Sequence, residues 1–484
     1  MIRDYNVISN KPEIVWVDNK KIDVLRLETE FYRSKYVNCL KLIEQMPNML
    51  LGDMIEDVKD GPGGWGIKAS EYVNKGVPML RGVNIVDGLL SIEDCVYISE
   101  EKQKELKRSK VVKDDVLLVV RGSIGIGKSA VYSKSYEANM NAAVVKLTFK
   151  NDLVDPYYVS CFFNSRYGRL QTERIANGVN QQNTNLTEVR SNRIPLPSRQ
   201  IQKYIGDKVR RAEELRDEAI RVKAAADKEL EDILEFKKLK ESLSTNKNKF
   251  SWVQSKKLDS RIDGEFYKKI FNINNEHIGN LDKMGIKALK LKDILKEGSY
   301  GILPSSNDYG SGQLGLLRST NLKEFLIEDS YVIKVPESYY KEKIEVKKGD
   351  ILLEIKGACY TGAIVEEITD KQIVNGSIYR FSIKEGFNNY YVLAYLLSES
   401  GQLQKQQNLA NSIISYLSLE SIKNLKIPII PEKKQQIIGD MYKKYVEHVR
   451  MSKYLIQQAK QDVENLLEGN LNMSKVDYDS GECR

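Results

Sequence analysis

The chain of 484 residues carries two copies of one sequence pattern. The block LRGVNI at 80–85 returns as LRSTNL at 317–322, and IPL at 194–196 returns as IPI at 427–429. Six such blocks recur in one order, at separations of 233 to 237 residues. A tandem duplication accounts for this agreement, so we expect two units that share one fold.

Each copy ends in a long stretch whose apolar residues recur every three or four positions, the spacing of one helix face. The first stretch, Ser198–Ser242, contains no proline and no glycine after Gly206, and the second covers Glu432–Glu468. At 1.5 Å per residue the first would be roughly 60–70 Å long, too long to be buried in one small core. We therefore predict two antiparallel spacer helices that form a coiled coil through their apolar seams. The seam residues expected at this interface are Val209, Leu215, Val222, Leu230, Met441, Tyr445 and Leu455.

Between these helices, Gly-rich turns precede short β-branched runs and then a helical pattern, which predicts a mixed α/β (α+β) fold with mostly antiparallel strands. The expected order is an N-terminal extension (1–50), a first globular domain (51–197), a central spacer helix (198–246), a linking segment (250–290), a second globular domain (291–431), a C-terminal spacer helix (432–468) and a tail (470–484). The two units would be related by a pseudo-two-fold axis.

Composition excludes several function classes. Five scattered cysteines without a C-x-x-C pair argue against a zinc ribbon or a disulfide scaffold and favour the cytoplasm. Only two histidines are present, so histidine catalysis and histidine-rich metal sites are not expected. No apolar run is long enough for a signal peptide or a membrane span. A net charge of +8 is compatible with a polyanionic partner.

Three segments look catalytic at first sight. The letters GSIGIGKS at 122–129 match a phosphate-binding loop, but a strand pattern follows where that loop needs a helix N-terminus, so a turn between strands is the better interpretation. DPYY at 155–158 resembles a methyltransferase motif but lacks its second proline, and an N-capped helix start accounts for it. Asp350, Glu354 and Lys356 resemble a nuclease site, yet the first copy does not retain the carboxylate pair. We therefore expect no catalytic residues and no metal ligands in this chain.

The repeated blocks and the two spacer helices resemble the specificity subunit of type I restriction–modification enzymes. The matching residues are 80–85, Asp115-Val116-Leu117-Leu118 with Arg121-Gly122, and Leu186 with Ile194-Pro195-Leu196-Pro197. The resemblance implies two target-recognition domains (51–197 and 291–431), each reading one half of a bipartite double-stranded DNA target. It also implies that the spacer helices dock methyltransferase subunits, two of them, and that restriction or translocase subunits are further partners. S-adenosylmethionine, ATP and Mg would then belong to those partner chains. Target-recognition domains of type IIB and IIG systems are similar, and that assembly stays open.

On this resemblance we name candidate DNA-binding residues. Arg81 with Asn84, and Arg318 with Asn321, hold equivalent places; arginine can pair with guanine and asparagine with adenine, although a surface charge and a turn asparagine would look the same. Arg121, Lys128 and Lys356 lie at the strand-to-turn segments and are expected to contact phosphates. Amide-rich loops supply the remaining candidates, namely Asn180, Gln181, Gln182, Asn408 and Asn411.

Two other functions stay open at the level of sequence. One is a DNA-modifying enzyme with a divergent active site, and the other is a coiled-coil scaffold without a DNA role. Binding of S-adenosylmethionine by the purified chain would indicate the first, and absence of salt-dependent DNA binding would indicate the second.

Overall fold

The computed structural model describes residues 14–24, 26–63, 66–122, 125–150, 153–178, 182–245, 258, 263–368, 370–410 and 415–479. They divide into two compact units, one within Met1–Arg216 and Arg450–Arg484 and the other within Asp217–Val449. Each unit is described by itself. Within the described residues, no helix is both long enough and apolar enough to cross a membrane.

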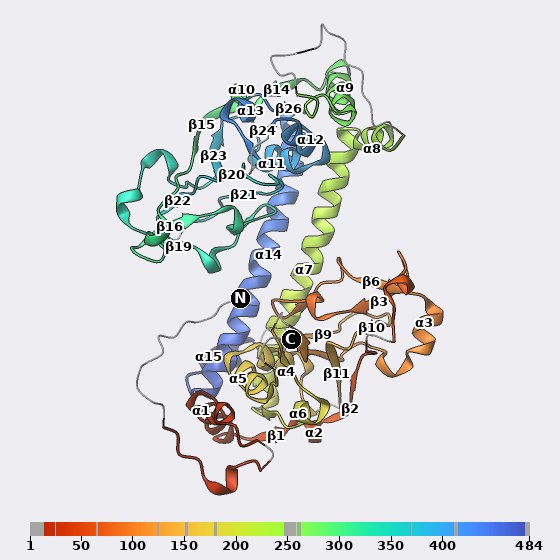
Figure 1. The fold of residues 1–484 in the computed structure, drawn as a ribbon, viewed down its shortest axis with the longest axis vertical. Coiled ribbons are helices and arrows are strands. Elements are labelled where there is room, and N and C mark those ends of the chain that lie inside the picture. The colour runs from red at the N-terminus through yellow and green to blue at the C-terminus, as the bar shows by residue number, and fades with distance from the viewer. Residues whose placement is uncertain are drawn as a thin grey trace. The chain divides into compact units, whose positions relative to one another are not determined.

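The first unit is built on a four-stranded antiparallel sheet. Its strands β2 (Ile55–Asp60), β11 (Val144–Phe149), β7 (Val116–Val119) and β9 (Ser129–Val131) lie in that order. All four residues of β7 are buried, as expected for a central strand covered on both faces. Helices α4 (Pro156–Asn164) and α5 (Arg166–Ile175) pack together, with α4 against β7 and β9 (Figure 1). A second sheet has the order β10 (Asn139–Met140), β3 (Val77–Leu80), β6 (Val96–Ile98).

The second unit repeats this arrangement. Its four-stranded sheet has the order β15 (Leu295–Tyr300), β23 (Ile378–Ile383), β20 (Ile351–Glu354), β21 (Gly362–Ile364), and its three-stranded sheet the order β19 (Ile333–Val335), β16 (Leu314–Leu317), β22 (Gln372–Val374). Helix α11 (Asn389–Leu397) packs on β21 and on α12 (Glu399–Gln407). The predicted duplication and the mixed α/β fold class are therefore confirmed.

In both units the globular part begins and ends on one pair of antiparallel strands. In the first unit β1 (Asn48–Leu50) pairs with β13 (Arg193–Pro195), and in the second β14 (Ala288–Lys290) pairs with β26 (Lys426–Pro428). The repeated isoleucine-proline blocks form β13 and β26. Buried tyrosine hydroxyls fix both strands, because Tyr158 donates to the Pro195 carbonyl at 3.0 Å and Tyr391 to that of Pro428 at 2.7 Å.

The remaining elements, apart from two long helices, complete the two units. The helices are α1 (Ser34–Glu44), α2 (Leu51–Met54), α3 (Glu100–Glu105), α6 (Leu186–Arg190), α8 (Phe236–Thr245), α9 (Lys269–Lys283), α10 (Leu291–Ile294), α13 (Leu419–Lys423) and α15 (Met473–Asp479). The strands are β4 (Ile85–Val86), β5 (Leu89–Leu90), β8 (Arg121–Gly122), β12 (Gln182–Asn183), β17 (Leu322–Lys323), β18 (Leu326–Ile327), β24 (Leu409–Ala410) and β25 (Tyr416–Leu417).

The two predicted spacer helices are α7 (Arg199–Ile233) and α14 (Glu432–Leu467). In the first unit Lys208 pairs with Asp462, and the Ser452 hydroxyl donates to the Ala212 carbonyl at 2.7 Å. In the second unit the Tyr442 hydroxyl donates to Asp227 at 2.7 Å, and His448 lies 3.5 Å from Glu218. Within each unit, the residue numbers of the contacting partners increase along α7 while they decrease along α14. The helix segments therefore run antiparallel, as predicted.

The buried face of α7 agrees with the prediction, but that of α14 does not. Val209, Leu215 and Leu230 are buried on α7, whereas Val222 is only partly buried. The buried seam of α14 consists of Ile438, Tyr442, Val446, Val449, Ser452, Ile456, Ala459 and Val463. Met441, Tyr445 and Leu455 lie one position before seam residues and pack at the side of the cores, partly buried. These three residues therefore flank the seam instead of forming it, one position away from the buried residues.

The central helix ends earlier than predicted. Helix α7 stops at Ile233, Glu235 adopts φ +51°, and α8 begins at Phe236, so residues 198–246 are not one helix. The Leu234 carbonyl just after the end of α7 is bonded by a distant residue, because His277 Nε2 donates to it at 2.9 Å. Burial lowers the pKa of His277, which keeps the ring neutral for this bond.

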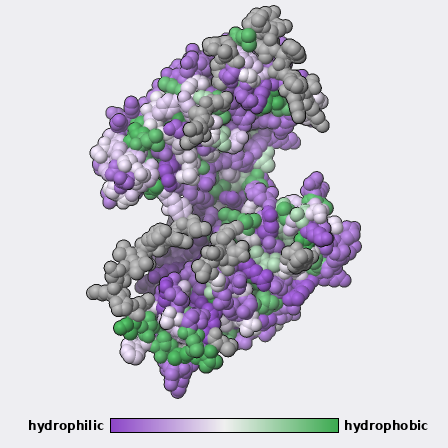
Figure 2. Space-filling model, viewed as in Figure 1, coloured by the Kyte–Doolittle hydropathy of each residue, from purple (hydrophilic) through white to green (hydrophobic). Residues whose placement is uncertain are grey.

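The described parts of the predicted N-terminal extension and linking segment contact the globular parts at residues 26–31 and at Phe266. Phe31 is buried beneath the guanidinium of Arg174, whose Cζ lies 3.7 Å from the ring centroid, and Arg26 lies 3.3 Å from Glu188. In the second unit Gln407 donates to the Phe266 carbonyl at 3.0 Å. The segment before Arg26 instead exposes Ile14, Trp16 and Val24. Figure 2 shows the hydrophobicity of the surface in one view.

Candidate nucleic-acid interface

The two repeated arginine-asparagine blocks fold into the same turn. The Arg81 amide donates to Asn84 Oδ1 at 3.0 Å, and Asn84 Nδ2 donates to the Ser91 carbonyl at 3.2 Å. In the second unit Asn321 accepts from the Arg318 amide at 2.9 Å and donates to the Glu328 carbonyl at 3.1 Å. Asn84 is 1% exposed and Asn321 is 2% exposed. Their amides hold the turn and are not presented to a base, so the prediction that they read adenine is corrected.

The arginines of these blocks keep unused hydrogen-bond donors. Arg81 donates from Nη2 to the Asp94 carbonyl at 3.1 Å, while its Nε has no partner in the structure. The Nε of Arg318 also has none. Both side chains are partly buried. Contact of Arg81 and Arg318 with guanine stays a prediction.

In the first unit an exposed polar edge surrounds Arg121. This residue begins β8, which pairs with β12 so that Gln182 lies opposite Gly122 and Asn183 opposite Arg121. The side chain of Arg121 is 47% exposed and lies 3.8 Å from Asp60. Gln182 and Asn183 are also exposed. The structure therefore brings a predicted cation and exposed amides together, a proximity that the sequence did not indicate, whereas Asn180 and Gln181 lie outside the described residues.

The second unit offers different chemistry at the corresponding edge. Lys356 forms a β-bridge with Tyr416, and both contribute to a hollow of about 410 Å³. Apolar and aromatic residues dominate its lining, among them Tyr300, Leu303, Leu417 and Leu419. Tyr300 ends β15 as Asp60 ends β2, so a tyrosine replaces the carboxylate that lies beside the first unit's cation. An aromatic apolar surface is better suited to contact base faces and methyl groups than to contact phosphates.

The amide predictions for the second unit are only partly tested. Asn408 terminates α12 and donates from Nδ2 to the Gln404 carbonyl at 2.8 Å. The Asn408 side chain therefore bonds the backbone at the end of its own helix. The residue is partly exposed. Asn411 lies outside the described residues.

The segments that resemble catalytic motifs have structural roles. Strand β9 follows Lys128 directly and pairs with β7, so the segment at 122–129 has no helix N-terminus after it, as predicted. Asp155 accepts from the amides of Tyr157 and Tyr158 and caps α4, also as predicted. Glu354 accepts from the amides of Tyr360 and Thr361, which closes the loop that follows Lys356. Among the described residues, no group of three His, Cys, Asp or Glu side chains could hold a metal ion.

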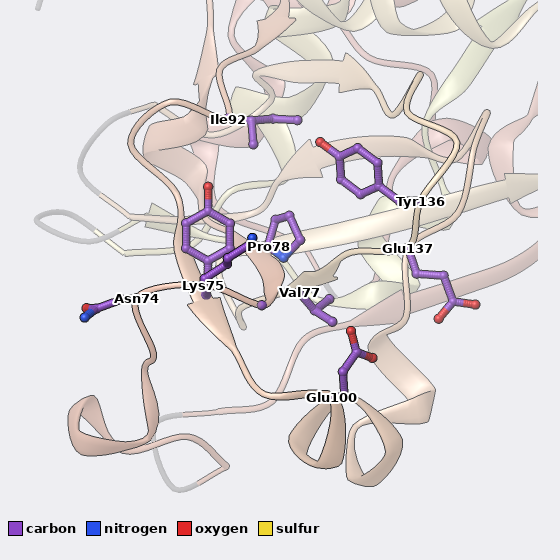
Figure 3. Close-up of a pocket in the computed structure, with 10 residues that line it drawn as sticks. Asn74, Lys75, Val77, Pro78, Ile92, Glu100, Tyr136 and Glu137 are labelled. Carbon is purple, nitrogen blue, oxygen red and sulfur yellow. The ribbon is translucent and has the colours of Figure 1, made fainter.

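A hollow of about 670 Å³ in the first unit has charges of both signs at its rim. It is lined by residues on β3, β6 and neighbouring loops, including Pro78, Tyr97 and Tyr136. Figure 3 shows Glu100 and Glu137 on its rim. Lys75 also lines the hollow, and Lys110, 2.9 Å from Glu137, lowers the pKa of that carboxyl, so cations accompany both carboxylates. The edge around exposed Arg121, rather than this hollow, stays the candidate interface of the first unit.

In the second unit a fully buried lysine, Lys405, contacts the loop that follows Lys356. Lys405 is 0% exposed, and its Nζ donates to the Cys359 carbonyl at 2.6 Å. Burial lowers the pKa of Lys405 to about 8, which makes it an unusual charge in a protein core.

Lys405 predicts a distinct pH dependence of stability. Between its folded pKa of about 8 and its ordinary value of 10.5, the unfolded chain binds a proton that the folded chain does not. The free energy of unfolding should therefore rise with pH in this window, by about 1 kcal/mol between pH 8 and 9. Urea titrations of the wild type and Lys405→Met at both pH values measure the effect. The variant should lack this contribution, and an equal pH dependence in both proteins would contradict the assignment.

Comparison with known proteins places these features in a family. A family model described as "Type I restriction modification DNA specificity domain" matches residues 47–219 and 284–461. The chain is 26% identical over 149 residues to the EcoBI type I restriction enzyme specificity subunit of Escherichia coli, a match that covers 31% of this chain and 30% of that protein. It is 22% identical over 429 residues to the MjaX specificity subunit of Methanocaldococcus jannaschii, which covers 86% of this chain and 91% of that protein.

Similar solved structures include an S subunit of a type I restriction-modification system from M. genitalium. That comparison has a TM-score of 0.43 and 12% sequence identity and covers 88% of this chain and 96% of the other. The HsdS subunit from Thermoanaerobacter tengcongensis, with a TM-score of 0.29 and 12% identity, covers 88% of this chain and 97% of the other.

Proposed function

Because the chain belongs to the family of the type I restriction modification DNA specificity domain, we propose that it is the DNA-reading subunit of a restriction–modification complex. Each unit would recognise one half of a bipartite double-stranded target. Exposed cations and amides at Arg121 and its neighbours would contact the first half-site. Lys356 and the aromatic hollow beside it would contact the second.

One observation carries this proposal, namely that two copies of one fold present different chemistry at equivalent edges. The cation Arg121 lies beside Asp60 and two exposed amides, whereas Lys356 lies beside Tyr300 and Tyr416. A scaffold that only held partners together would have no reason to diversify this edge while it kept the sheets and turns. Two modules that read different base sequences need this combination.

The spacer helices would serve as the platform for the other subunits. Their seam is buried within each unit, but their remaining faces carry many exposed charged residues, such as Arg211 and Lys443, which pair with Glu214 and Glu447 on their own helices. We propose that methyltransferase subunits, two of them, and restriction or translocase subunits dock there. S-adenosylmethionine, ATP and Mg would be bound by those subunits, and this chain would supply no catalytic group. Assembly as a type IIB or IIG system is the second candidate, which the shared recognition-domain pattern favours.

The proposal predicts that one unit can be exchanged without affecting the other. Strands β1 and β13 pair with each other, so the chain enters and leaves the first globular part at adjacent points. Replacement of residues 48–195 by the matching segment of another specificity subunit should change one half of the methylated motif only. Methylome sequencing of a host that carries the exchanged system gives the result. A change in both halves would argue against modular reading, and reciprocal exchange of residues 288–428 is the matched control.

A further inference from the structure

Two cationic side chains of the first unit meet beneath the Gly-rich turn. Lys128 immediately precedes β9, and Arg169 lies in the first half of α5. Gly125, in the turn that precedes Lys128, has a φ of +93°. A Cβ atom at Gly125 would lie 3.0 Å from Arg169 Nη2 and 3.9 Å from Lys128 Cε. Glycine therefore lets the backbone approach both side chains closely.

This pair of cations has no matching anion within the described part of the chain. No ion pair involves Lys128 or Arg169 there, and Arg169 Nη1 is buried without a hydrogen-bond partner. Glu173, the nearest acidic residue on α5 that acts on Arg169, instead pairs with Lys35 at 3.4 Å. Burial and the charge of Arg169 lower the pKa of Lys128, while Asp87 opposes this effect without forming an ion pair. Repulsion between the two cations and a buried donor without a hydrogen-bond partner both cost free energy. An anion bound between the cations would remove both costs.

The second unit shows that the fold does not require these charges. Thr361 precedes β21 as Lys128 precedes β9, and Gln402 holds the place in α12 that Arg169 holds in α5. Both replacements are neutral, and Gln402 donates to the Tyr360 carbonyl at 3.1 Å. The second unit carries a different cation, Lys405, which is fully buried and bonded to a carbonyl. Structural need therefore does not explain the pair in the first unit.

We propose that Lys128 and Arg169 form a built site for one phosphate group, and that a backbone phosphate of the first half-site occupies it. The choice of DNA rests on the proposed function and on chain continuity, since exposed Arg121 begins the same turn. A guanidinium and an ammonium together supply several charge-assisted donors to phosphate oxygens. The strand that follows Lys128 leaves no helix N-terminus for a polyphosphate, which disfavours a nucleotide at the same place.

The duplication supplies the variant that tests this site. In Lys128→Thr with Arg169→Gln, the first unit receives the residues that the second unit already accommodates. The complete complex, purified from a host that carries the system, should bind its target less tightly, and the logarithmic salt slope of binding should fall by about 1. The methylated sequence should stay the same, because a phosphate contact positions DNA without reading bases. A control that removes equal charge from exposed positions, Arg33→Gln with Lys104→Thr, should leave the slope unchanged.

Chemical protection identifies the occupant independently. Acylation of Lys128 by an amine-reactive reagent, measured by mass spectrometry, should slow when target duplex is added to the wild-type complex. Protection should disappear in Arg169→Gln. Protection by ATP but not by duplex would overturn the assignment to DNA, and an unchanged slope with no protection by either would overturn the site. If the wild-type complex shows no sequence preference at all, the proposed function fails instead, a result that the same binding measurement shows directly.

Discussion

Replacement of Arg380 by leucine should lower the free energy of unfolding of the second unit by about 3–5 kcal/mol, the range for breaking a buried ion pair from one side. Arg380 is 1% exposed and donates from Nε to Asp350 at 2.6 Å, and Asp350 is 2% exposed. Arg380 Nη2 also donates to Glu297 Oε1 at 2.6 Å. Leucine would leave the Asp350 carboxylate buried without its main counter-charge. Urea unfolding at pH 7 measures the loss.

The first unit provides the control for this prediction. Lys146 occupies the place of Arg380 on the equivalent strand, but its Nζ lies 3.6 Å from Asp115. Asp115 also accepts from the Thr148 hydroxyl at 2.5 Å and from the Val112 amide at 2.9 Å, so it depends less on the cation. Lys146→Leu should therefore cost clearly less than Arg380→Leu. Equal losses would contradict the account, and the double replacement Asp350→Leu with Arg380→Leu should recover much of the loss.

The duplication and the layout of each unit could be predicted because they depend on patterns that repeat. Six blocks at near-constant separation require one fold twice, and the glycine-rich turns and β-branched runs specify strands. The turn at 122–129 was also predictable, since a strand pattern follows Lys128. The same reasoning separated an N-capping Asp155 from a methyltransferase motif.

The seam of α14 and the end of α7 could not be predicted, because each depends on tertiary partners. Ser452 lies in the seam since its hydroxyl reaches the Ala212 carbonyl across the helix pair. Helix α7 stops where His277, far along the chain, accommodates the Leu234 carbonyl. A pattern of apolar residues contains neither contact, so the sequence favoured a longer helix and a face shifted by one residue.

The candidate site was predicted unevenly for a similar reason. The equivalent positions of Arg81 and Arg318 were visible in the repeat, but the burial of Asn84 and Asn321 follows from carbonyls seven residues further along. Asp60 and Tyr300, which give the two edges their different character, end strands whose pairing is not apparent in sequence. Arg169 was missed because nothing in its helix marks it. Comparison of the copies at equivalent positions would have shown that the second copy has Gln402 in its place.

Insertion of four residues into each spacer helix should change the DNA target more than any substitution considered above. Both helices pass from one unit to the other, between Arg216 and Asp217 and between Val449 and Arg450. Equal insertions at these points preserve the pairing on either side, because Ala212 meets Ser452 and Glu218 meets His448. Four residues add about 6 Å of helix, so we expect the unread gap to grow by about one or two base pairs. Methylation of the original target should then be lost.

The methylated motif of that insertion variant, read by sequencing the methylome of its host, tests the central claim most directly. Two units that each read their own half-site predict that both half-sites keep their bases while the gap between them lengthens. A conservative control replaces four residues at the same points without changing the length, and it should leave the motif unaltered. Full methylation of the original motif by the insertion variant, or altered bases within a half-site, would contradict the account.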